Sequence, residues 1–144
     1  MKRIIFISLM ALCFTGCAKF NPQYFNSTIE RQTQSINFNI LADDMVDFIS
    51  INFLANTTTF YIHTDDLDKN FYDYLTNKLR NKGYAISDNS SIKGLTFLSY
   101  NIFEQDNKIY LSYNLDEKKV SRAYEIIDNK PVPIGNITTF NFNN

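Results

Sequence analysis

The residue types that usually carry chemistry or covalent cross-links are scarce in this chain. Its 144 residues include two cysteines, one histidine, four glycines and no tryptophan. A common zinc site takes three or four Cys, His or carboxylate ligands. A phosphate-binding loop of the G-x-x-x-x-G-K-[ST] type needs a glycine spacing that is absent here. The composition therefore argues against both kinds of site, and we expect no metal and no cofactor.

The chain also lacks an excess of positive charge. It has 14 basic and 15 acidic residues, which gives a net charge of −1. Proteins that bind nucleic acid usually present a clustered basic surface. We therefore expect no direct contact with nucleic acid.

No hydrophobic run in the sequence is long enough to span a bilayer as a helix. The longest runs from Ile4 to Phe14, whereas a transmembrane helix needs roughly 20 apolar residues. Lys2 and Arg3 precede this run and Thr15-Gly16 follow it. A basic tip, a short apolar core and small residues before a cleavage point are typical of a secretory signal peptide. We assign residues 1–16 to such a peptide.

Cys17 follows Thr15-Gly16 directly, and the segment resembles a bacterial lipobox. Phe14 stands where leucine is most often found. In this interpretation the Cys17 thiol receives a diacylglycerol, the chain is cut before it, and acyl chains such as palmitate anchor the product in the membrane. One acyl chain anchors only marginally, and two or more anchor stably. The alternative is an ordinary cleaved signal with a chance cysteine.

Cleavage before Cys17 would leave a mature chain without disulfides. Cys13 would leave with the signal peptide, so Cys17 would be the only cysteine left. Losing Lys2 and Arg3 leaves 12 basic against 15 acidic residues, a net charge of −3. Despite an oxidising envelope compartment, the fold must therefore be held by burial, to which the large Phe and Tyr side chains contribute most.

Residues 17–37 are predicted to be the lipidated cysteine and a tether, because they are polar and show no clear period. Phe20, Tyr24, Phe25 and Ile29 are unusual in a pure spacer. They could dock on a partner or on the domain's own surface, and we favour the second.

Two amphipathic helices are predicted in the domain, which we place at 38–144. The first spans 40–53, with Asn39 as its cap and Asp43 and Asp44 in its first turns, where the helix dipole favours negative charge. The second begins at Thr64 or Asp65 and ends at Gly83, a C-cap residue. Its apolar stripe and its basic last turn support this assignment.

The rest of the chain alternates with a period of two, which predicts strands. We expect strands at 56–63, 84–87, 95–104, 109–115, 120–127 and 137–142. Short turns separate the strands between 95 and 127, so these should form an antiparallel meander, and Pro131 and Pro133 confine the last part of the chain to a sheet margin. The predicted fold is α+β, with two helices on one face of a mainly antiparallel sheet.

The candidates for catalysis are few. His63 is the only histidine, and a triad could be written with Ser87 or Ser112, but no G-x-S-x-G context supports it. The pairs Asp43-Asp44 and Asp65-Asp66 could perform acid–base chemistry if burial separated their pKa values. Both pairs open helices, which explains them without chemistry. We predict no catalytic residues, no enzymatic activity and no small-molecule substrate.

The remaining feature is aromatic surface. Phe103 and Tyr110 alternate with apolar residues that should face the helices, so they should point away from them. Such residues can be scattered exposed aromatics, or part of a patch or open sheet edge that pairs with another envelope protein.

Four stretches of the sequence resemble TrbH-type conjugal transfer lipoproteins. They are Leu41-Ala42-Asp43-Asp44, the segment from Phe71 to Ala85 that contains Leu79-Arg80-Asn81-Lys82-Gly83-Tyr84, Ser121-Arg122-Ala123-Tyr124, and Pro133-Ile134-Gly135. The resemblance runs in order from about Phe38 to Asn144. Leu-Ala-Asp-Asp before an amphipathic helix also occurs in flagellar lipoproteins of the FlgO type.

The resemblance implies a non-enzymatic component of a conjugative type IV secretion system. Ala18 after the cysteine, rather than aspartate, points by the usual sorting tendency to the outer membrane, with the domain facing the periplasm. Its partners would be the membrane, through lipid on Cys17, and other secretion-channel proteins. The alternative is a binding module of another system, either a flagellar accessory or a surface-exclusion lipoprotein. An envelope hydrolase that depends on His63 is a third hypothesis.

Overall fold

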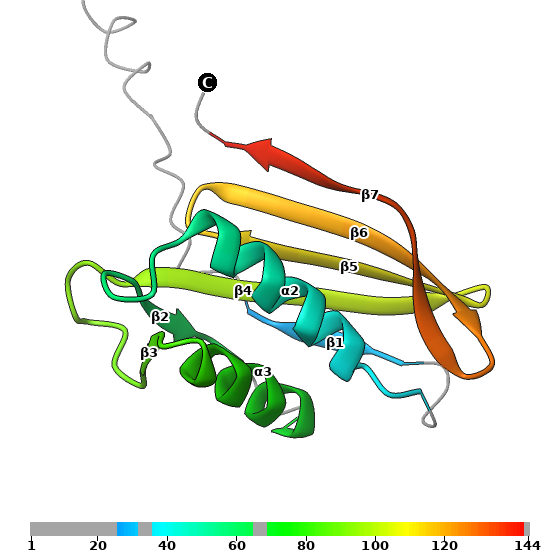
Figure 1. Cartoon of the computed structure of the whole chain (residues 1–144), viewed down its shortest axis with the longest axis horizontal. Coiled ribbons are helices and arrows are strands. Elements are labelled where there is room, and N and C mark those ends of the chain that lie inside the picture. The colour runs from blue at the N-terminus through cyan, green and yellow to red at the C-terminus, as the bar shows by residue number, and fades with distance from the viewer. Residues whose placement is uncertain (1–25, 32–35, 65–68, 143–144) are drawn as a thin grey trace, which may run out of the picture.

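The described residues of the computed structural model form two layers. Residues 26–31, 36–64 and 69–142 are described. Within them, two helices lie on one face of a seven-stranded sheet (Figure 1), which confirms the predicted α+β class. The elements are β1 (Thr28–Glu30), α2 (Asn39–Asn52), β2 (Thr59–Ile62), α3 (Lys69–Asn81), β3 (Ala85–Ser87), β4 (Thr96–Gln105), β5 (Lys108–Leu115), β6 (Lys118–Ile127) and β7 (Lys130–Asn141).

The sheet has a parallel part and an antiparallel part. Its strand order is β3-β2-β4-β5-β6-β7, and β1 pairs with the second half of β4. Strands β4, β5 and β6 form the predicted meander, and β7 extends it by pairing antiparallel with β6. Strands β1 and β2 run parallel to β4, and β3 runs parallel to β2. Parallel neighbours need long crossovers, and α2 and α3 lie in the two connections that link β1, β2 and β3.

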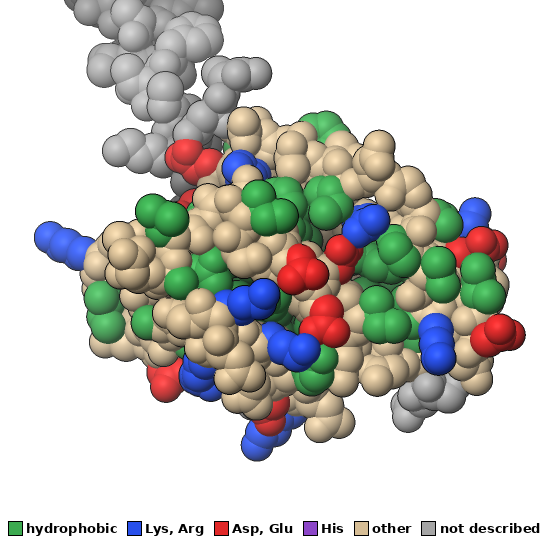
Figure 2. Space-filling view, in the orientation of Figure 1, with side chains coloured by type: hydrophobic (Ala, Val, Ile, Leu, Met, Phe, Trp, Pro, Cys, Tyr) green, Lys and Arg blue, Asp and Glu red, His purple; other side chains and the backbone are tan. Residues whose placement is uncertain are grey.

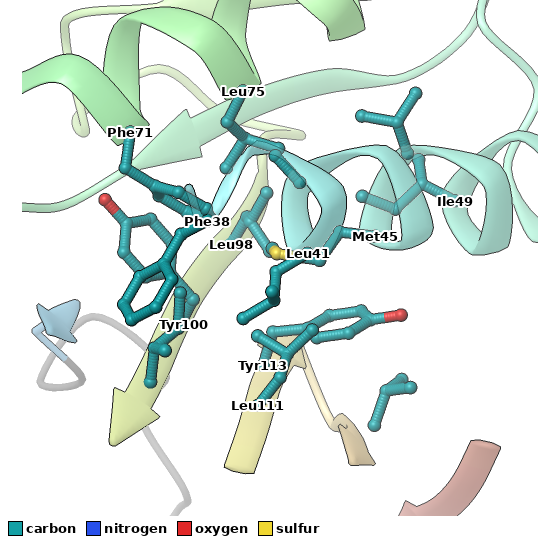
Figure 3. Close-up of a cluster of buried hydrophobic side chains, with 14 of the residues drawn as sticks. Phe38, Leu41, Met45, Ile49, Phe71, Leu75, Leu98, Tyr100, Leu111 and Tyr113 are labelled. Atoms are coloured by element: carbon teal, nitrogen blue, oxygen red, sulfur yellow. The ribbon is translucent and has the colours of Figure 1, made fainter. Parts of the chain in front are cut away.

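The core fills the space between the helices and the sheet (Figure 3). Alternate residues of each meander strand point toward the helices, as the period of two predicts. Each large apolar side chain that is removed from water contributes about 1.5–3 kcal/mol, which is how the described residues, none of which is a cysteine, can hold together. The fully buried members include Leu41, Met45, Ile49, Phe60, Phe71, Leu75, Leu79, Leu98, Ile102, Ile109 and Tyr124.

The first helix is close to its predicted span, but its predicted cap is wrong. Helix α2 begins at Asn39 itself, and Phe38 occupies the cap position without a side-chain hydrogen bond. The Asn37 side-chain oxygen accepts a hydrogen bond from the Asn39 backbone N–H at 2.9 Å. The polar side chain that serves this end therefore lies two residues before the predicted one.

The second helix ends as predicted. Gly83 has φ +93°, its N–H donates to the Arg80 carbonyl at 2.9 Å, and the Tyr84 N–H donates to the Leu79 carbonyl at 3.1 Å. This pair of bonds is the Schellman arrangement. Lys78 and Arg80 lie in the last turn. Of the two residues predicted to start it, Thr64 forms an isolated parallel bridge with Ser27, and Asp65 lies with Asp66 in residues 65–68, outside the described residues.

Part of the predicted tether belongs to the sheet. Strand β1 pairs with Asn101–Phe103 of β4. Ser27, just before it, is buried, accepts a hydrogen bond from the Tyr100 N–H at 3.2 Å, and donates its own N–H to the His63 carbonyl at 3.2 Å. Ile29 packs against the core. A three-residue strand carries too little pattern to stand out in a polar segment.

The hairpin turns use aspartate and asparagine where other proteins often use glycine. Asp106 and Asn107 have φ of 50° and 62°, and Asp128 and Asn129 have φ of 50° and 59°. Two successive positive φ values are the mark of a type I′ turn, whose twist matches that of the flanking strands. Asn and Asp tolerate this region better than other non-glycine residues, so the scarcity of glycine does not prevent tight hairpins.

Strand β7 is longer than predicted and forms an edge of the sheet. It starts at Lys130 rather than at residue 137, and a register irregularity between Ser121 and Ala123 interrupts its pairing with β6. Pro131 and Pro133 lie in its first half. Proline cannot donate a ladder hydrogen bond, which restricts it to positions such as an edge strand.

Asp116 closes the β5–β6 hairpin and joins it to β4. Its carboxylate accepts a hydrogen bond from the Phe97 N–H at 2.8 Å, and its own N–H donates to the Phe97 carbonyl at 3.0 Å. Burial raises the pKa of the Asp116 carboxyl, and the Phe97 hydrogen bond opposes this only in part.

We predict that Gly83→Ala destabilises the domain by about 1 kcal/mol, because a Cβ atom disfavours the left-handed backbone. The new Cβ would lie 3.6 Å from the Ala55 Cβ, an ordinary contact, so the cost is conformational. Gly83→Asn should cost less, since asparagine tolerates positive φ. Urea denaturation of the purified protein measures both, and equal stability of the Ala variant and the parent would contradict the prediction.

We predict that Asp116→Asn becomes more favourable, relative to the parent, as the pH rises from 3 to 7. A carboxyl whose folded pKa is raised stabilises the fold fully below its unfolded pKa of about 3.9 and loses this contribution as the pH rises through the folded pKa. Asparagine keeps the acceptor for Phe97 and tolerates the φ of 50° at this position. Denaturation midpoints at the two pH values provide the measurement. Asp106→Asn, the same change in an exposed turn, is the control and should show a smaller pH-dependent difference.

Candidate functional site

A buried polar cluster joins α2 to β6. Asp44 accepts hydrogen bonds from the Arg122 guanidinium at 2.6 and 2.9 Å, and a short hydrogen bond from the Tyr124 hydroxyl. The side chains of Asp44 and Arg122 are 22% and 21% exposed, so the pair lies largely out of water. Arg122 stands where the β6–β7 register is irregular. The cluster therefore fixes the helix onto the sheet beside this irregularity.

The tyrosines around this cluster are held in their neutral form. Burial raises the pKa of Tyr124 far above its usual value, and the hydrogen-bonded Asp44 carboxylate raises it further. Burial also raises the pKa of Tyr113, with Asp44 as the next cause. A neutral phenol donates its hydrogen to the carboxylate, so Tyr124 adds a hydrogen bond to the Asp44–Arg122 ion pair.

The neighbouring carboxylate points to the other helix. Asp43 accepts hydrogen bonds from the Tyr74 hydroxyl at 3.1 and 3.2 Å and forms a salt bridge with Lys78 at 2.9 Å. The hydrogen bond to Asp43, followed by that to Tyr74, raises the pKa of Lys78. Figure 2 shows acidic and basic side chains side by side over the helical layer. Neither carboxylate lies in the first turn of α2, so the dipole explanation for this pair is wrong.

The other predicted candidates give no active-site geometry. The His63 ring stacks on Tyr61, with the Tyr61 hydroxyl 3.3 Å from His63 Nδ1. The Ser87 hydroxyl donates a hydrogen bond to the Asn89 carbonyl and accepts one from the Asn89 N–H, each at 3.1 Å. Ser112 lies on β5. These contacts do not support the triad. Asp65, Asp66 and Cys17 lie outside the described residues.

The candidate interaction surface is the far face, by which we mean the side of β4–β7 turned away from the helices. Phe103 and Tyr110 stack there at 4.8 Å between ring centroids, and they are 38% and 36% exposed. The prediction that they point away from the helices is confirmed. A hollow of about 460 Å³ lies beside them and reaches Ile134 of β7.

The outer edge of β7 adds a second feature. In the described part of the chain β6 is the only strand that pairs with β7. Its second half, from Ile134 to Asn141, contains neither proline nor a charged residue, although these are the usual protection of an exposed edge. This edge is therefore suited to pairing with another strand.

Comparison with protein families gives a match that covers residues 20–143, to the family described as conjugal transfer protein TrbH. The chain belongs to the TrbH family. No curated protein matches it, and no solved structure matches it. The match confirms the resemblance drawn from the sequence and makes the protein a component of conjugal transfer.

The structure explains why the TrbH-like stretches have their composition. Leu41–Asp44 and Ser121–Tyr124 meet in the Asp44–Arg122–Tyr124 cluster. Tyr84, which follows the Gly83 cap, donates its hydroxyl to the Phe53 carbonyl at 2.8 Å and thereby satisfies the end of α2. In the last stretch, Pro133 lies opposite Tyr124, and Gly135 has φ +80°.

Sequence reasoning missed these links. Asp44 and Arg122 are 78 residues apart, and nothing in their separate surroundings pairs them. The signal in the sequence was Arg122, which lies between Val120 and Tyr124 on the face of its strand that points toward the core. A charged side chain at such a position requires a partner. In the described part of the chain, no group of three or more His, Cys, Asp or Glu side chains could hold a metal ion, and no helix is both long and apolar enough to cross a membrane.

We predict that Asp44→Ala destabilises the domain by about 2 kcal/mol, because it leaves Arg122 and the Tyr124 hydroxyl without their acceptor. This is below the loss typical of a fully buried pair, since each partner remains about one-fifth exposed. Asp43→Ala is the matched control on the adjacent residue. Its salt bridge to Lys78 is about 40% exposed on both sides, so its loss should destabilise the domain less than Asp44→Ala does. Thermal and urea denaturation of the two variants would contradict the assignment if Asp44→Ala were no more costly.

Proposed function

We propose that this TrbH-family protein is an outer-membrane lipoprotein that acts as a structural and assembly component of a conjugative type IV secretion system. Its domain faces the periplasm, and it has no catalytic role. The family match carries the link to conjugal transfer. The context of Cys17 supports the anchor, and Ala18 after it supports the outer membrane.

The anchor follows from the chemistry of the amino terminus. Residues 4–14 are too short for a transmembrane helix but suit a signal peptide. With two or more acyl chains on Cys17, each buried methylene contributing about 0.8 kcal/mol, the protein would stay on its membrane. Only the few residues between Cys17 and Ser27 would then separate the lipid from the sheet.

The charged side chains that define the helical layer support a structural role. Asp43, Asp44, Lys78 and Arg122 are engaged with one another or with tyrosine hydroxyls. The open edge of β7 is the feature suited to a partner, because an uncharged strand with unpaired backbone groups accepts an added strand. A strand of another transfer-system protein is the occupant we propose.

The alternative, a flagellar accessory or surface-exclusion lipoprotein, rests on the Leu41–Asp44 stretch and the lipobox, which other envelope lipoproteins share. The match over residues 20–143 favours conjugal transfer. Neighbouring genes that encode a secretion ATPase and channel proteins would agree with the first function, and motility genes with the second.

We predict that Cys17→Ser releases the protein from the outer-membrane fraction, or leaves it as an unprocessed precursor, and lowers the frequency of DNA transfer. Cys13→Ser is the matched control. Because Cys13 lies inside the apolar core of the signal peptide, this substitution should leave the membrane fractionation and the transfer frequency unchanged. Membrane fractionation, mass spectrometry of the amino terminus and mating assays provide the measurements. Unchanged fractionation and transfer in Cys17→Ser cells would refute the proposal.

A further inference from the structure

Two adjacent hollows on the far face share part of their lining. The first, of about 460 Å³, lies between the Phe103–Tyr110 pair and Ile134. The second, of about 470 Å³, extends from the same strands toward Asn26. Phe103, Ser112 and Lys119 line both. We call the combined feature the far-face groove, and it crosses the sheet from β4 to β7.

The described part of the chain begins at this groove. Asn26, the first described residue, lines its second hollow together with Phe103 and Lys119. Neighbouring strands are about 4.8 Å apart, so β7 is about 14 Å from β4. The six residues 20–25 span about 20 Å when extended. They are long enough to reach across the groove from where the described chain begins.

The composition of those six residues matches the groove. They include Phe20, Tyr24 and Phe25 and carry no charge. The charged residues that line the groove are Lys119 and Arg122, and the guanidinium of Arg122 is bound to Asp44 on the helical side. An uncharged aromatic segment would bring no charge of its own into the groove, and it would remove exposed aromatic area from water.

We infer that residues 20–25 pack into the far-face groove against the Phe103–Tyr110 pair. Ile29, another apolar residue of the predicted tether, packs against the core on the helical side of the sheet, and the inference adds a contact of residues 20–25 with the far face. The segment then serves as a strap over the sheet rather than a spacer, and the open edge of β7 remains for a partner. This inference goes beyond the proposed function and does not depend on it.

The absence of tryptophan makes a direct test possible. Phe25→Trp gives the full-length protein, purified in detergent, a single tryptophan. We expect blue-shifted emission and weak quenching by acrylamide. Tyr110→Lys in the same background places a charge in the groove and should shift the emission to the red and increase quenching. Ile51→Lys is the matched control, because Ile51 is 84% exposed on α2 in the opposite layer, and it should change neither.

Several outcomes would overturn the inference. One is emission typical of exposed indole in the parent background. Another is a protected indole whose emission and quenching change neither with Tyr110→Lys nor with a second groove variant, Ala123→Glu, although circular dichroism shows that both variants are folded. The detergent micelle, and not the groove, would then protect the indole. Protection that grows with protein concentration would assign the groove to a second copy. Protection that requires other transfer proteins would assign it to a partner. A normal Cys17 anchor with any of these results leaves the proposed function standing.

Discussion

Two consecutive carboxylates of helix α2 bind partners on two sides of the helix. The position of the helical layer on the sheet depends on these contacts. Asp43 reaches α3, and Asp44 reaches Arg122 and Tyr124 on β6. Successive helix residues diverge by about 100°, which is why neighbours in sequence can serve different partners. Burial of apolar side chains stabilises the packing of the helix on the sheet, but the hydrophobic effect is not directional. The charged contacts supply the direction, because a buried arginine has few acceptable positions for its partner.

The two faces of the sheet therefore differ in what they expose. The side that contacts the helices is closed, and the Asp44 carboxylate there binds Arg122 Nη1 and the Tyr124 hydroxyl. The far face carries the exposed Phe103 and Tyr110, and the β7 edge carries the uncharged segment from Ile134 to Asn141. The surfaces that the helices leave open are therefore the ones available to a partner.

The TrbH-like stretches are explained largely by the fold. The aspartate of one stretch binds the arginine of another, and Tyr84 of a third completes the end of α2. A family recognised through such positions identifies a shared scaffold and its place in conjugal transfer. Its partner has to be sought at positions that packing does not explain, such as Phe103, Tyr110 and the second half of β7.

Local chemistry in the sequence determined the element types, most of their limits and the α+β class. The alternating pattern of β4 to β6, the Gly83 cap and the outward direction of Phe103 and Tyr110 each follow from a few adjacent residues. Tertiary structure alone decided the rest. Three features each join residues that are far apart in the chain: the parallel pairing of β1 and β2 with β4, the contact of Asp44 with its partner, and the groove beside Asn26. Periodicity could not predict them, because it indicates which face of an element a residue occupies and not which distant residue lies opposite.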